Sequence, residues 1–314
     1  MKLSKVLLSV VLASSIAPFS SLAADPVSCK AVRFADVGWT DITATTAVAS
    51  SLLSALSYEP DVKVLSVPVT YTSLKNGDID VFLGNWMPTM EADIKPYRED
   101  ESVETLVRNL EGAKYTLATN EYGAQLGVMS FSDIAKHADA LDNKIYGIEP
   151  GNDGNRLIQG MIDENTFALK DFEVVESSEQ GMLSQVSRAD RKKQAVVFLG
   201  WEPHPMNSNF QLTYLEGGDE IFGPNLGGAE VFTNIRAGFA QECPNVGQLL
   251  SNLAFTLAME NEIMGAILDD DEEPEVAAKK WIANHPGVLD AWLMKVNTLD
   301  GQPGLAAVKK ALSL

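Results

Sequence analysis

The tetrapeptide Val-Phe-Leu-Gly occurs twice in this sequence, and both copies stand in similar surroundings. The copies occupy residues 81–84 and 197–200, and each is soon followed by a tryptophan, Trp86 or Trp201, with a proline two residues beyond it. Each copy is also preceded by the same predicted order of elements: strand, polar loop, helix, strand, helix. Repetition of a whole series of elements indicates two units of like structure. The sequence therefore predicts two similar α/β lobes.

Apolar residues recur along both halves with the spacing of strands and helices. The predicted strands cover residues 30–35, 62–69, 81–84, 144–148, 172–175, 195–200 and 231–237. The predicted helices cover residues 43–56, 70–76, 131–140, 178–188, 246–258, 259–268, 275–284 and 305–312, with a further helix from Asn155. Residues 114–119 form an isolated extended run, which we interpret as a connector between the lobes. We expect the C-terminal helices to cover the outside of the first lobe, with Trp281 and Trp292 in its core.

The first 23 residues have the composition of a secretory signal peptide. Lys2 and Lys5 precede an apolar run over residues 6–13, and small residues end the segment at Ala23. This run is too short to span a bilayer, and no other segment approaches the roughly 20 apolar residues that spanning requires. We expect cleavage after Ala23 and a free periplasmic protein.

The chain is strongly acidic. Its formal charge is −19, and removal of the signal peptide makes it −21 because Lys2 and Lys5 are lost. Such a surface repels nucleic acid and anionic lipid, so we expect neither nucleic acid nor a membrane surface as a partner. The charge attracts small cations weakly, although it can equally serve only to keep an abundant protein soluble.

The chain contains two cysteines, Cys29 and Cys243. An even number in an oxidising compartment predicts a disulfide. The bond would return the segment around Cys243 to the lobe that contains the first strand, although the chain between them is long. The predicted division is a discontinuous first lobe of residues 24–114 and 209–314, a second lobe of residues 115–208, and hinge crossings near Tyr115 and Asn209.

Aromatic and polar side chains follow the ends of the predicted strands. Trp39 and Asp41 lie in the segment Ala-Asp-Val-Gly-Trp-Thr-Asp-Ile, after the first strand. Parallel strands present such turns to a ligand cleft. A tryptophan ring attracts a cation and a carboxylate adds negative charge, so the pair indicates a site for a positively charged ligand. In the alternative interpretation, Trp39 fills the core and Asp41 caps the following helix. The other predicted cleft residues are Trp86, Asn152 and Trp201.

The sequence lacks three common motifs of enzyme active sites. The chain has three histidines and contains no Gly-x-Ser-x-Gly, His-Glu-x-x-His or Gly-x-x-x-x-Gly-Lys motif. A catalytic triad can form from distant residues, so hydrolysis stays open as an alternative. The acidic run 269–273 lacks the ligand spacing of a calcium loop, and we interpret His204, between two prolines, as a structural hydrogen-bonding residue. We expect no enzyme activity, no cofactor and no bound metal.

Several segments carry a family resemblance: Ala-Asp-Val-Gly-Trp-Thr-Asp-Ile, Asn-Trp-Met-Pro-Thr, Glu-Pro-Gly-Asn-Asp-Gly-Asn, Gly-Trp-Glu-Pro-His-Pro-Met-Asn, and the cysteine pair. Together they closely resemble the periplasmic choline-binding proteins of bacterial ABC importers, within the glycine betaine and choline binding family, over nearly the whole mature chain. The resemblance implies a two-lobed α/β fold, the type II periplasmic binding protein, with a disulfide between Cys29 and Cys243. It also implies an aromatic box around a trimethylammonium group, formed by Trp39, Trp86, Tyr115 and Trp201.

By the same resemblance, Asp41 faces the cation and Asn152 serves the hydroxyl end of the ligand. Asp41 would repel the carboxylate of betaine, and the quoted segments offer no positive charge except Arg156, just past the Asn152 loop. We therefore expect choline as the ligand, betaine or acetylcholine as weaker ligands, and an ABC permease of the inner membrane as the partner of a monomer. The alternatives are a glycine betaine-binding protein of the same fold, a sugar-binding protein and a choline-ester hydrolase.

Overall fold

One mixed β-sheet runs through the described chain. The computed structural model describes residues 24–314, and the predicted signal peptide, residues 1–23, lies outside the described residues. The nine strands follow the order β2-β1-β3-β9-β4-β7-β5-β6, and β8 pairs with β4. The strands are β1 (Ala31–Asp36), β2 (Glu59–Val64), β3 (Val81–Met87), β4 (Val103–Asn120), β5 (Lys144–Tyr146), β6 (Glu173–Val175), β7 (Val197–Glu202), β8 (Leu212–Tyr214) and β9 (Gly228–Arg236).

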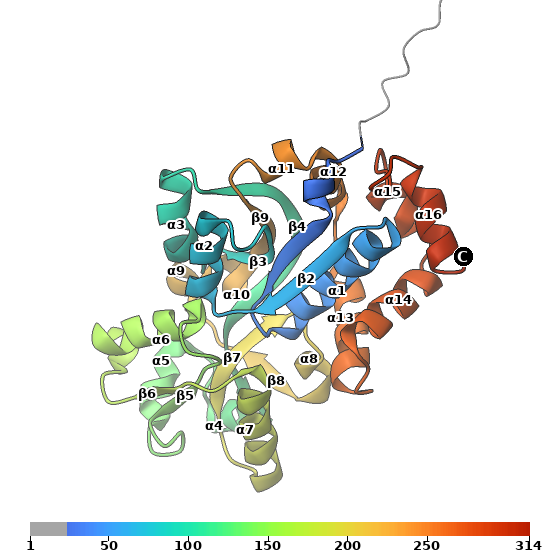
Figure 1. The fold of residues 1–314 in the computed structure, drawn as a ribbon. Helices are drawn as coiled ribbons and strands as arrows, with labels where there is room; N and C mark the ends of the chain where they lie inside the picture. The colour runs from blue at the N-terminus through green and yellow to red at the C-terminus, as the bar shows by residue number, and fades with distance from the viewer. Residues whose placement is uncertain (1–23) are drawn as a thin grey trace, which may run out of the picture.

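Helices cover the two ends of this sheet. They are α1 (Thr40–Ala55), α2 (Val67–Asn76), α3 (Glu91–Glu99), α4 (Glu121–Leu126), α5 (Phe131–Ile134), α6 (Asp153–Asp163), α7 (Glu179–Lys192), α8 (Met206–Asn209), α9 (Asp219–Phe222), α10 (Pro224–Gly227), α11 (Phe239–Glu242), α12 (Pro244–Asn252), α13 (Leu257–Leu268), α14 (Pro274–Asn284), α15 (Val288–Trp292) and α16 (Gly304–Ala311). Figure 1 shows α13 to α16 beside α1 at one end of the molecule and α4 and α7 at the other.

Helix α1 is buried on nearly all sides. It packs against α13, α14 and α16 as well as against β1, β2 and β3. Its sequence is rich in alanine, serine and threonine, and these small side chains let neighbouring elements approach from several directions. A helix surrounded in this way takes its position from tertiary packing. The start of α1, which carries two predicted cleft residues, is therefore firmly placed.

The long strand β4 connects the two ends of the sheet. Its first part pairs with β9, from Val103 opposite Arg236 onward, and its last part pairs with β7, as far as Thr119 opposite Val197. The sequence predicted only an isolated extended run over residues 114–119. The strand is longer because its first half finds its partner in β9, more than a hundred residues away, and no local pattern records that pairing.

The chain returns along β9 after passing through the second end of the sheet. Strand β8 pairs with residues 118–120 of β4, on the edge of β4 opposite to β7, which pairs with residues 114–119. From β8 the chain runs through α9 and α10 into β9. The lobe boundaries at residues 114/115 and 208/209 stay a prediction.

Other predicted elements also differ in their bounds, and two of them show the physical reason. The strand predicted over residues 62–69 is β2, which ends at Val64, and α2 begins at Val67. Pro68 stands in the first turn of α2, where its fixed φ suits a helix and its missing N–H has no partner to lose. The helix predicted over residues 246–258 ends at Asn252, and α13 begins after Thr256, whose hydroxyl accepts a hydrogen bond from the backbone N–H of Met259.

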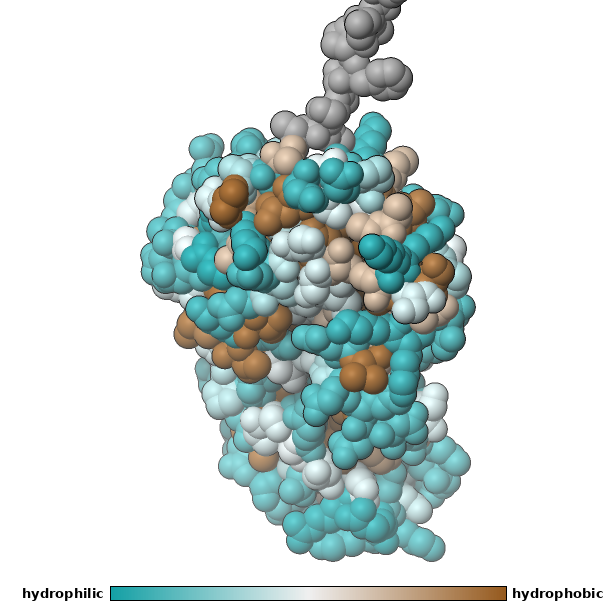
Figure 2. Space-filling model, turned by 45° about the vertical axis from the view of Figure 1, so that its right-hand side comes forward, coloured by the Kyte–Doolittle hydropathy of each residue, from teal (hydrophilic) through white to brown (hydrophobic). Residues whose placement is uncertain are grey.

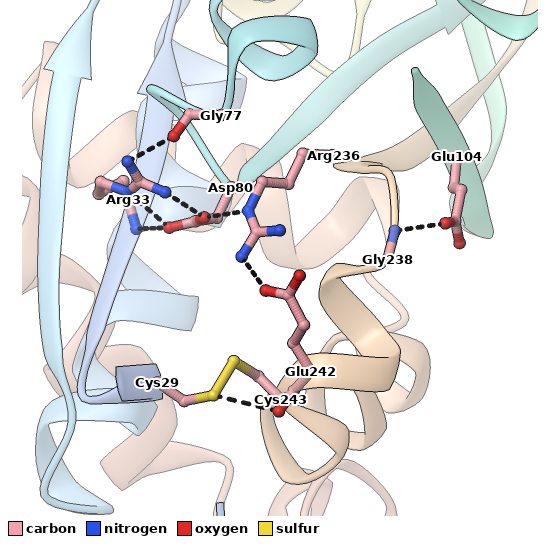
Figure 3. A network of polar contacts seen from close by, with 9 residues as sticks. All are labelled: Cys29, Arg33, Gly77, Asp80, Glu104, Arg236, Gly238, Glu242 and Cys243. Carbon is pink, nitrogen blue, oxygen red and sulfur yellow. Dashed lines mark hydrogen bonds and ion pairs between the residues drawn. A yellow bond between two sulfur atoms is a disulfide. The ribbon is translucent and has the colours of Figure 1, made fainter. Parts of the chain in front are cut away.

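An ion cluster around the buried Asp80 and a disulfide hold the first end of the sheet together (Figure 3). The carboxylate of Asp80 accepts hydrogen bonds from Arg33 Nε at 2.8 Å and from Arg236 Nε at 2.7 Å. Burial raises the pKa of Asp80, but these bonds outweigh it and hold the pKa below its usual range. The predicted disulfide between Cys29 and Cys243 is present, with the two Cα atoms 5.7 Å apart. It ties the segment before β1 to the start of α12.

The surface agrees with the acidic composition. Figure 2 shows a face on which hydrophilic residues predominate and apolar residues gather in small, separate groups. Among residues 24–314, no helix is both long and apolar enough to cross a membrane.

Candidate functional site

Four aromatic side chains meet around one cavity. Trp39, Trp86, Tyr115 and Trp201 are each at least 94% buried. Together with Asp41, Ile148 and Asp153 they line one small cavity, whose walls are almost entirely apolar. The sites of drug-sized ligands are considerably larger. This site therefore suits a small molecule.

Strand pairing explains why these rings converge. Tyr115 in β4 lies directly opposite Trp201 in β7, and directly paired residues of antiparallel strands point to the same face. Their ring centroids are 6.3 Å apart, and those of Tyr115 and Trp86 in β3 are 6.1 Å apart. Trp39 reaches the cavity from the turn between β1 and α1. The four rings thus come from four separate segments on both ends of the sheet.

Two glycines leave room for Tyr115. A Cβ on Gly154, in the first turn of α6, would lie 2.0 Å from the phenol oxygen of Tyr115. A Cβ on Gly227 would lie 2.0 Å from the backbone oxygen of the same residue, and Gly227 has a φ of +73°. Any larger residue at these positions would push Tyr115 out of place. The cavity therefore depends on both glycines as well as on the rings.

Asp41 presents an unpaired oxygen at the cavity. Trp86 donates its indole N–H to Asp41 Oδ2 at 3.1 Å, while Asp41 Oδ1 is buried without a hydrogen-bond partner among the described residues. Burial, followed by the nearby charge of Glu179, raises the pKa of Asp41 to about 8. A positively charged ligand would favour the ionised form of this carboxyl group.

Asp153 is a second acidic residue of the cavity, and sequence reasoning missed it. Its side chain is fully buried and its Oδ2 lacks a hydrogen-bond partner within residues 24–314. Burial raises its pKa to about 6, although the nearby Thr89 hydroxyl counteracts this in part. The residue stands next to Asn152 in a segment that the sequence had singled out. An acidic residue in a first helical turn is common, so nothing local distinguished it.

Asn152 lies behind the cavity wall and does not line the cavity. Its Oδ1 accepts hydrogen bonds from the Tyr115 hydroxyl and from the backbone N–H of Asn155, both at 3.1 Å. Its Nδ2 donates to Asp153 Oδ1, also at 3.1 Å. The amide thus caps α6 and holds two residues that do line the cavity. The other five predicted ligand-binding residues all border it.

Further acidic residues surround the cage. The indole N–H of Trp39 donates to Glu149 Oε1 at 2.8 Å, and burial raises the pKa of Glu149 to about 7. His204, interpreted from the sequence as a structural residue, makes two hydrogen bonds, from the Met206 N–H to its Nδ1 and between its Nε2 and Glu179. The cavity thus has aromatic walls in an electronegative setting.

The cavity is equipped to hold a small cation. The lining contains no serine, cysteine or histidine that could act as a nucleophile or a proton carrier. Across the described part of the chain, no group of three or more His, Cys, Asp and Glu side chains is placed to hold a metal ion. The ring faces suit a positively charged group that has no hydrogen-bond donors, and the carboxyl groups of Asp41 and Asp153 can add negative charge.

Comparisons with known proteins agree with this geometry. Residues 30–284 match the family described as the substrate binding domain of ABC-type glycine betaine transport system. An ABC-transporter choline-binding protein in complex with choline is 69% identical, with a TM-score of 0.91, and the match covers 92% of this chain and 100% of that one. An ABC-transporter choline-binding protein in an unliganded semi-closed conformation is 70% identical over 91% of this chain and 100% of that one, with a TM-score of 0.85.

A more distant structure extends the family. The lactococcal OpuAC, in a closed conformation with glycine betaine, is 25% identical over 84% of this chain and 99% of that one, with a TM-score of 0.76. The shared architecture is the predicted two-lobed type II periplasmic binding protein, with a ligand cleft between the lobes and two crossings of the hinge. The chain belongs to the family of substrate-binding domains of ABC-type glycine betaine transport systems.

Proposed function

We propose that this protein binds choline for an ABC importer. As a member of its family it is the solute-binding component of such a transporter, acts outside the cytoplasm and is not an enzyme. The observation that carries the proposal is the single cavity walled by Trp39, Trp86, Tyr115 and Trp201 and bordered by Asp41. The relative bound to choline, at 69% identity, supports it. The predicted signal peptide supports a periplasmic location.

The chemistry of the cavity matches a quaternary ammonium group. Such a group carries a charge but no N–H, so hydrogen-bond acceptors alone cannot recognise it. Aromatic faces attract it through their quadrupoles, and each contributes about 0.5 to 2 kcal/mol depending on desolvation. Four buried rings supply that attraction from several sides, while Asp41, whose ionised form the cation favours, adds a negative charge. Maltose or another sugar would need more polar partners than this apolar lining provides.

Charge favours choline over glycine betaine. Betaine carries a carboxylate, and the unpaired oxygens of Asp41 and Asp153 would repel it. Arg156, the nearby cation, binds both oxygens of Asp93, at 2.8 and 2.7 Å, and so is already paired. Betaine is the second candidate, because the lactococcal relative was solved with it.

Lobe closure accompanies binding in this proposal. The rings come from both lobes, so the cage is complete only when the lobes meet, and the cognate permease would recognise the closed form. Choline has about seven heavy atoms, and a ceiling near 1.5 kcal/mol per atom limits binding to about 10 kcal/mol, or tens of nanomolar. We therefore expect a dissociation constant between that limit and the micromolar range, measured on a monomer.

The experiment is a ligand screen followed by titration. A thermal-shift screen with choline, acetylcholine, betaine, carnitine, proline and maltose should give its largest shift with choline, because binding stabilises the folded state. Calorimetry should then rank choline first and betaine or acetylcholine lower. Betaine binding as tightly as choline would reverse the charge argument, and a shift with maltose alone would remove the proposal.

A further inference from the structure

A hydrogen-bonded contact crosses the cleft behind the cage. Glu179, the first residue of α7, accepts hydrogen bonds from the backbone N–H of Thr40 at 2.8 Å and from the Thr40 hydroxyl at 2.5 Å. Thr40 begins α1 at the other end of the sheet. The two residues are 139 positions apart in the sequence, and both are at least 96% buried.

This contact completes a helix end. The first N–H groups of a helix have no partner inside the helix. Trp39, at the N-cap of α1, makes no capping hydrogen bond through its side chain. A carboxylate from the other lobe fills that role, and it also complements the positive end of the helix dipole. The N-terminus of α1 is thus capped by Glu179 only when the lobes are together.

Both ends of the contact are linked to the aromatic cage, one through the chain and the other through His204. Thr40 directly follows Trp39 in the chain. Glu179 Oε1 is also 3.1 Å from His204 Nε2, and because the Met206 N–H donates to His204 Nδ1, the proton of the ring is assigned to Nε2. The His204 ring packs edge-on against Trp201, with centroids 4.9 Å apart. One carboxylate therefore sets the positions of a cage ring in each lobe.

We propose that Glu179 is a positioning residue that couples lobe closure to assembly of the cage. The inference rests on the proposed function, since the cage is taken to hold choline. In the open form the two bonds to Thr40 are absent, and water solvates both partners. In the closed form the bonds stabilise the conformation that holds ligand. Because apparent affinity scales with the population of the competent conformation, the contact tightens binding without touching the ligand.

The test is a set of substitutions at Thr40. T40P removes both donors, the backbone N–H and the hydroxyl. Proline should fit this position, because it is favoured in the first turn of a helix. Trp39 also has the extended backbone that a residue before proline requires, with φ −89° and ψ 132°. T40S keeps both donors and is the matched control. We expect T40P to weaken choline binding about tenfold or more, the loss of bonds to a charged acceptor, mainly through faster dissociation. T40S should bind like the unchanged protein.

A double-mutant cycle tests the pair directly. E179Q should also weaken choline binding, because a glutamine amide has one acceptor oxygen where Glu179 uses two for Thr40. The combined T40P/E179Q variant should bind little worse than E179Q alone and clearly better than the sum of the two single losses predicts, because both changes act on the same contact. Thermal midpoints of the ligand-free variants should stay near that of the unchanged protein. D80N is the control for a change that lowers only the stability of the fold. Asp80 and its arginine partners lie within one lobe, so D80N should lower the thermal midpoint and leave choline affinity unchanged.

A measurement on the ligand-free protein tests the role of Glu179 independently of the proposed binding of choline. Fluorescent labels placed one on each lobe report the closed fraction of the empty protein, which T40P and E179Q should lower and T40S should not. Unchanged closed fractions, or additive effects in the cycle, would overturn the role of Glu179. Failure of the unchanged protein to bind choline would overturn the proposed function instead, while the closed fractions still decide the role of Glu179.

Discussion

Trp86 donates its indole N–H to Asp41, and the two atoms are 3.1 Å apart. The bond uses the edge of the ring and one carboxylate oxygen. The ring face and the second oxygen of Asp41 therefore stay available to the cavity that both residues line. A carboxyl group buried in this way carries a proton more readily than an exposed one, and its charge state should respond to a cationic ligand.

Choline affinity should rise with pH between about 6 and 8. The pKa of Asp41 is raised to about 8 in the empty closed site, chiefly by burial. Since choline favours the ionised carboxylate, binding near pH 7 must release a proton, and this cost disappears as pH passes the pKa. Calorimetry in two buffers of different ionisation heat measures the release. D41N should bind more weakly and lose most of the pH dependence, with Glu149, whose pKa is about 7, contributing the remainder.

The raised pKa of Asp41 also makes the free energy of unfolding depend on pH. The trend is opposite to that of choline affinity, because this contribution falls as pH rises. Between the ordinary pKa of 3.8 and about 8, the folded closed form holds a proton on Asp41 that the unfolded chain has lost. The unfolded state therefore binds fewer protons, and the contribution of Asp41 to the free energy of unfolding falls as pH rises through this window. Denaturant unfolding of the ligand-free protein and of D41N at pH 5 and pH 8 measures it. A smaller loss of stability in D41N is expected, and equal losses would contradict the assignment.

Removal of one cage ring should weaken binding more than stability. W39A and W201A should each weaken choline about tenfold or more, the loss of one well-desolvated cation–π face, with little change in the melting temperature of the empty protein. The control is W281A. Trp281 lies outside the cage, where it stacks on Trp292, so its removal should lower the melting temperature and leave affinity unchanged. A matching loss of stability in W39A or W201A would mean that these rings serve the core.

Asp153 should distinguish choline from tetramethylammonium. Its free Oδ2 borders the cavity, where it can accept the hydroxyl hydrogen of choline, whereas tetramethylammonium has no hydroxyl. A hydrogen bond to a charged group contributes about 1.5 to 3 kcal/mol, so D153N should weaken choline about tenfold and tetramethylammonium clearly less. Paired titrations with the two ligands measure the ratio. Equal losses would show that Asp153 acts only through its charge, and would leave the predicted role of Asn152 at the hydroxyl end in place.

The ion pair between α6 and α3 should contribute only slightly to choline binding. Arg156 on α6 and Asp93 on α3 form a bidentate pair whose side chains are 40% and 10% exposed. Partly exposed pairs contribute about 1 kcal/mol or less, so D93N should weaken choline by at most about fivefold at low salt. The difference should vanish near 1 M salt, where charges are screened. D100N, which removes the exposed Lys75 pair, is the control and should leave affinity unchanged at every salt concentration.

The disulfide should stabilise the fold and have no effect on choline affinity. Cys29 and Cys243 are 214 positions apart, and a loop of that length corresponds to about 5 kcal/mol in the chain-entropy model, often less in practice. A C29S/C243S variant should therefore unfold at a lower denaturant concentration. Its affinity for choline should match that of the oxidised protein, because both cysteines lie away from the cavity. Weaker binding would mean that the bond also constrains the cleft.

Local patterns in the sequence predicted much of the fold. The repeated Val-Phe-Leu-Gly segments lie in β3 and β7. Both strands extend past the predicted ends and include Trp86 and Trp201, which both reach the cavity. A strand and the residues near its end can be predicted from the sequence, because the signals that mark them lie within a few positions of each other. The even cysteine count predicted the disulfide, because two cysteines in an oxidising compartment are expected to pair.

The sequence alone thus determined which residues could form an aromatic cage, whereas the structure places only Trp39 on a turn and the other three rings within strands. Only the tertiary structure decided that Asp153, and not Asn152, borders the cavity, that β4 extends back to Val103, and that Glu179 caps the helix after Trp39. The physical reason is shared by all three. Each depends on hydrogen bonds or packing between segments far apart in the chain, and such contacts exist only once the lobes have folded and met.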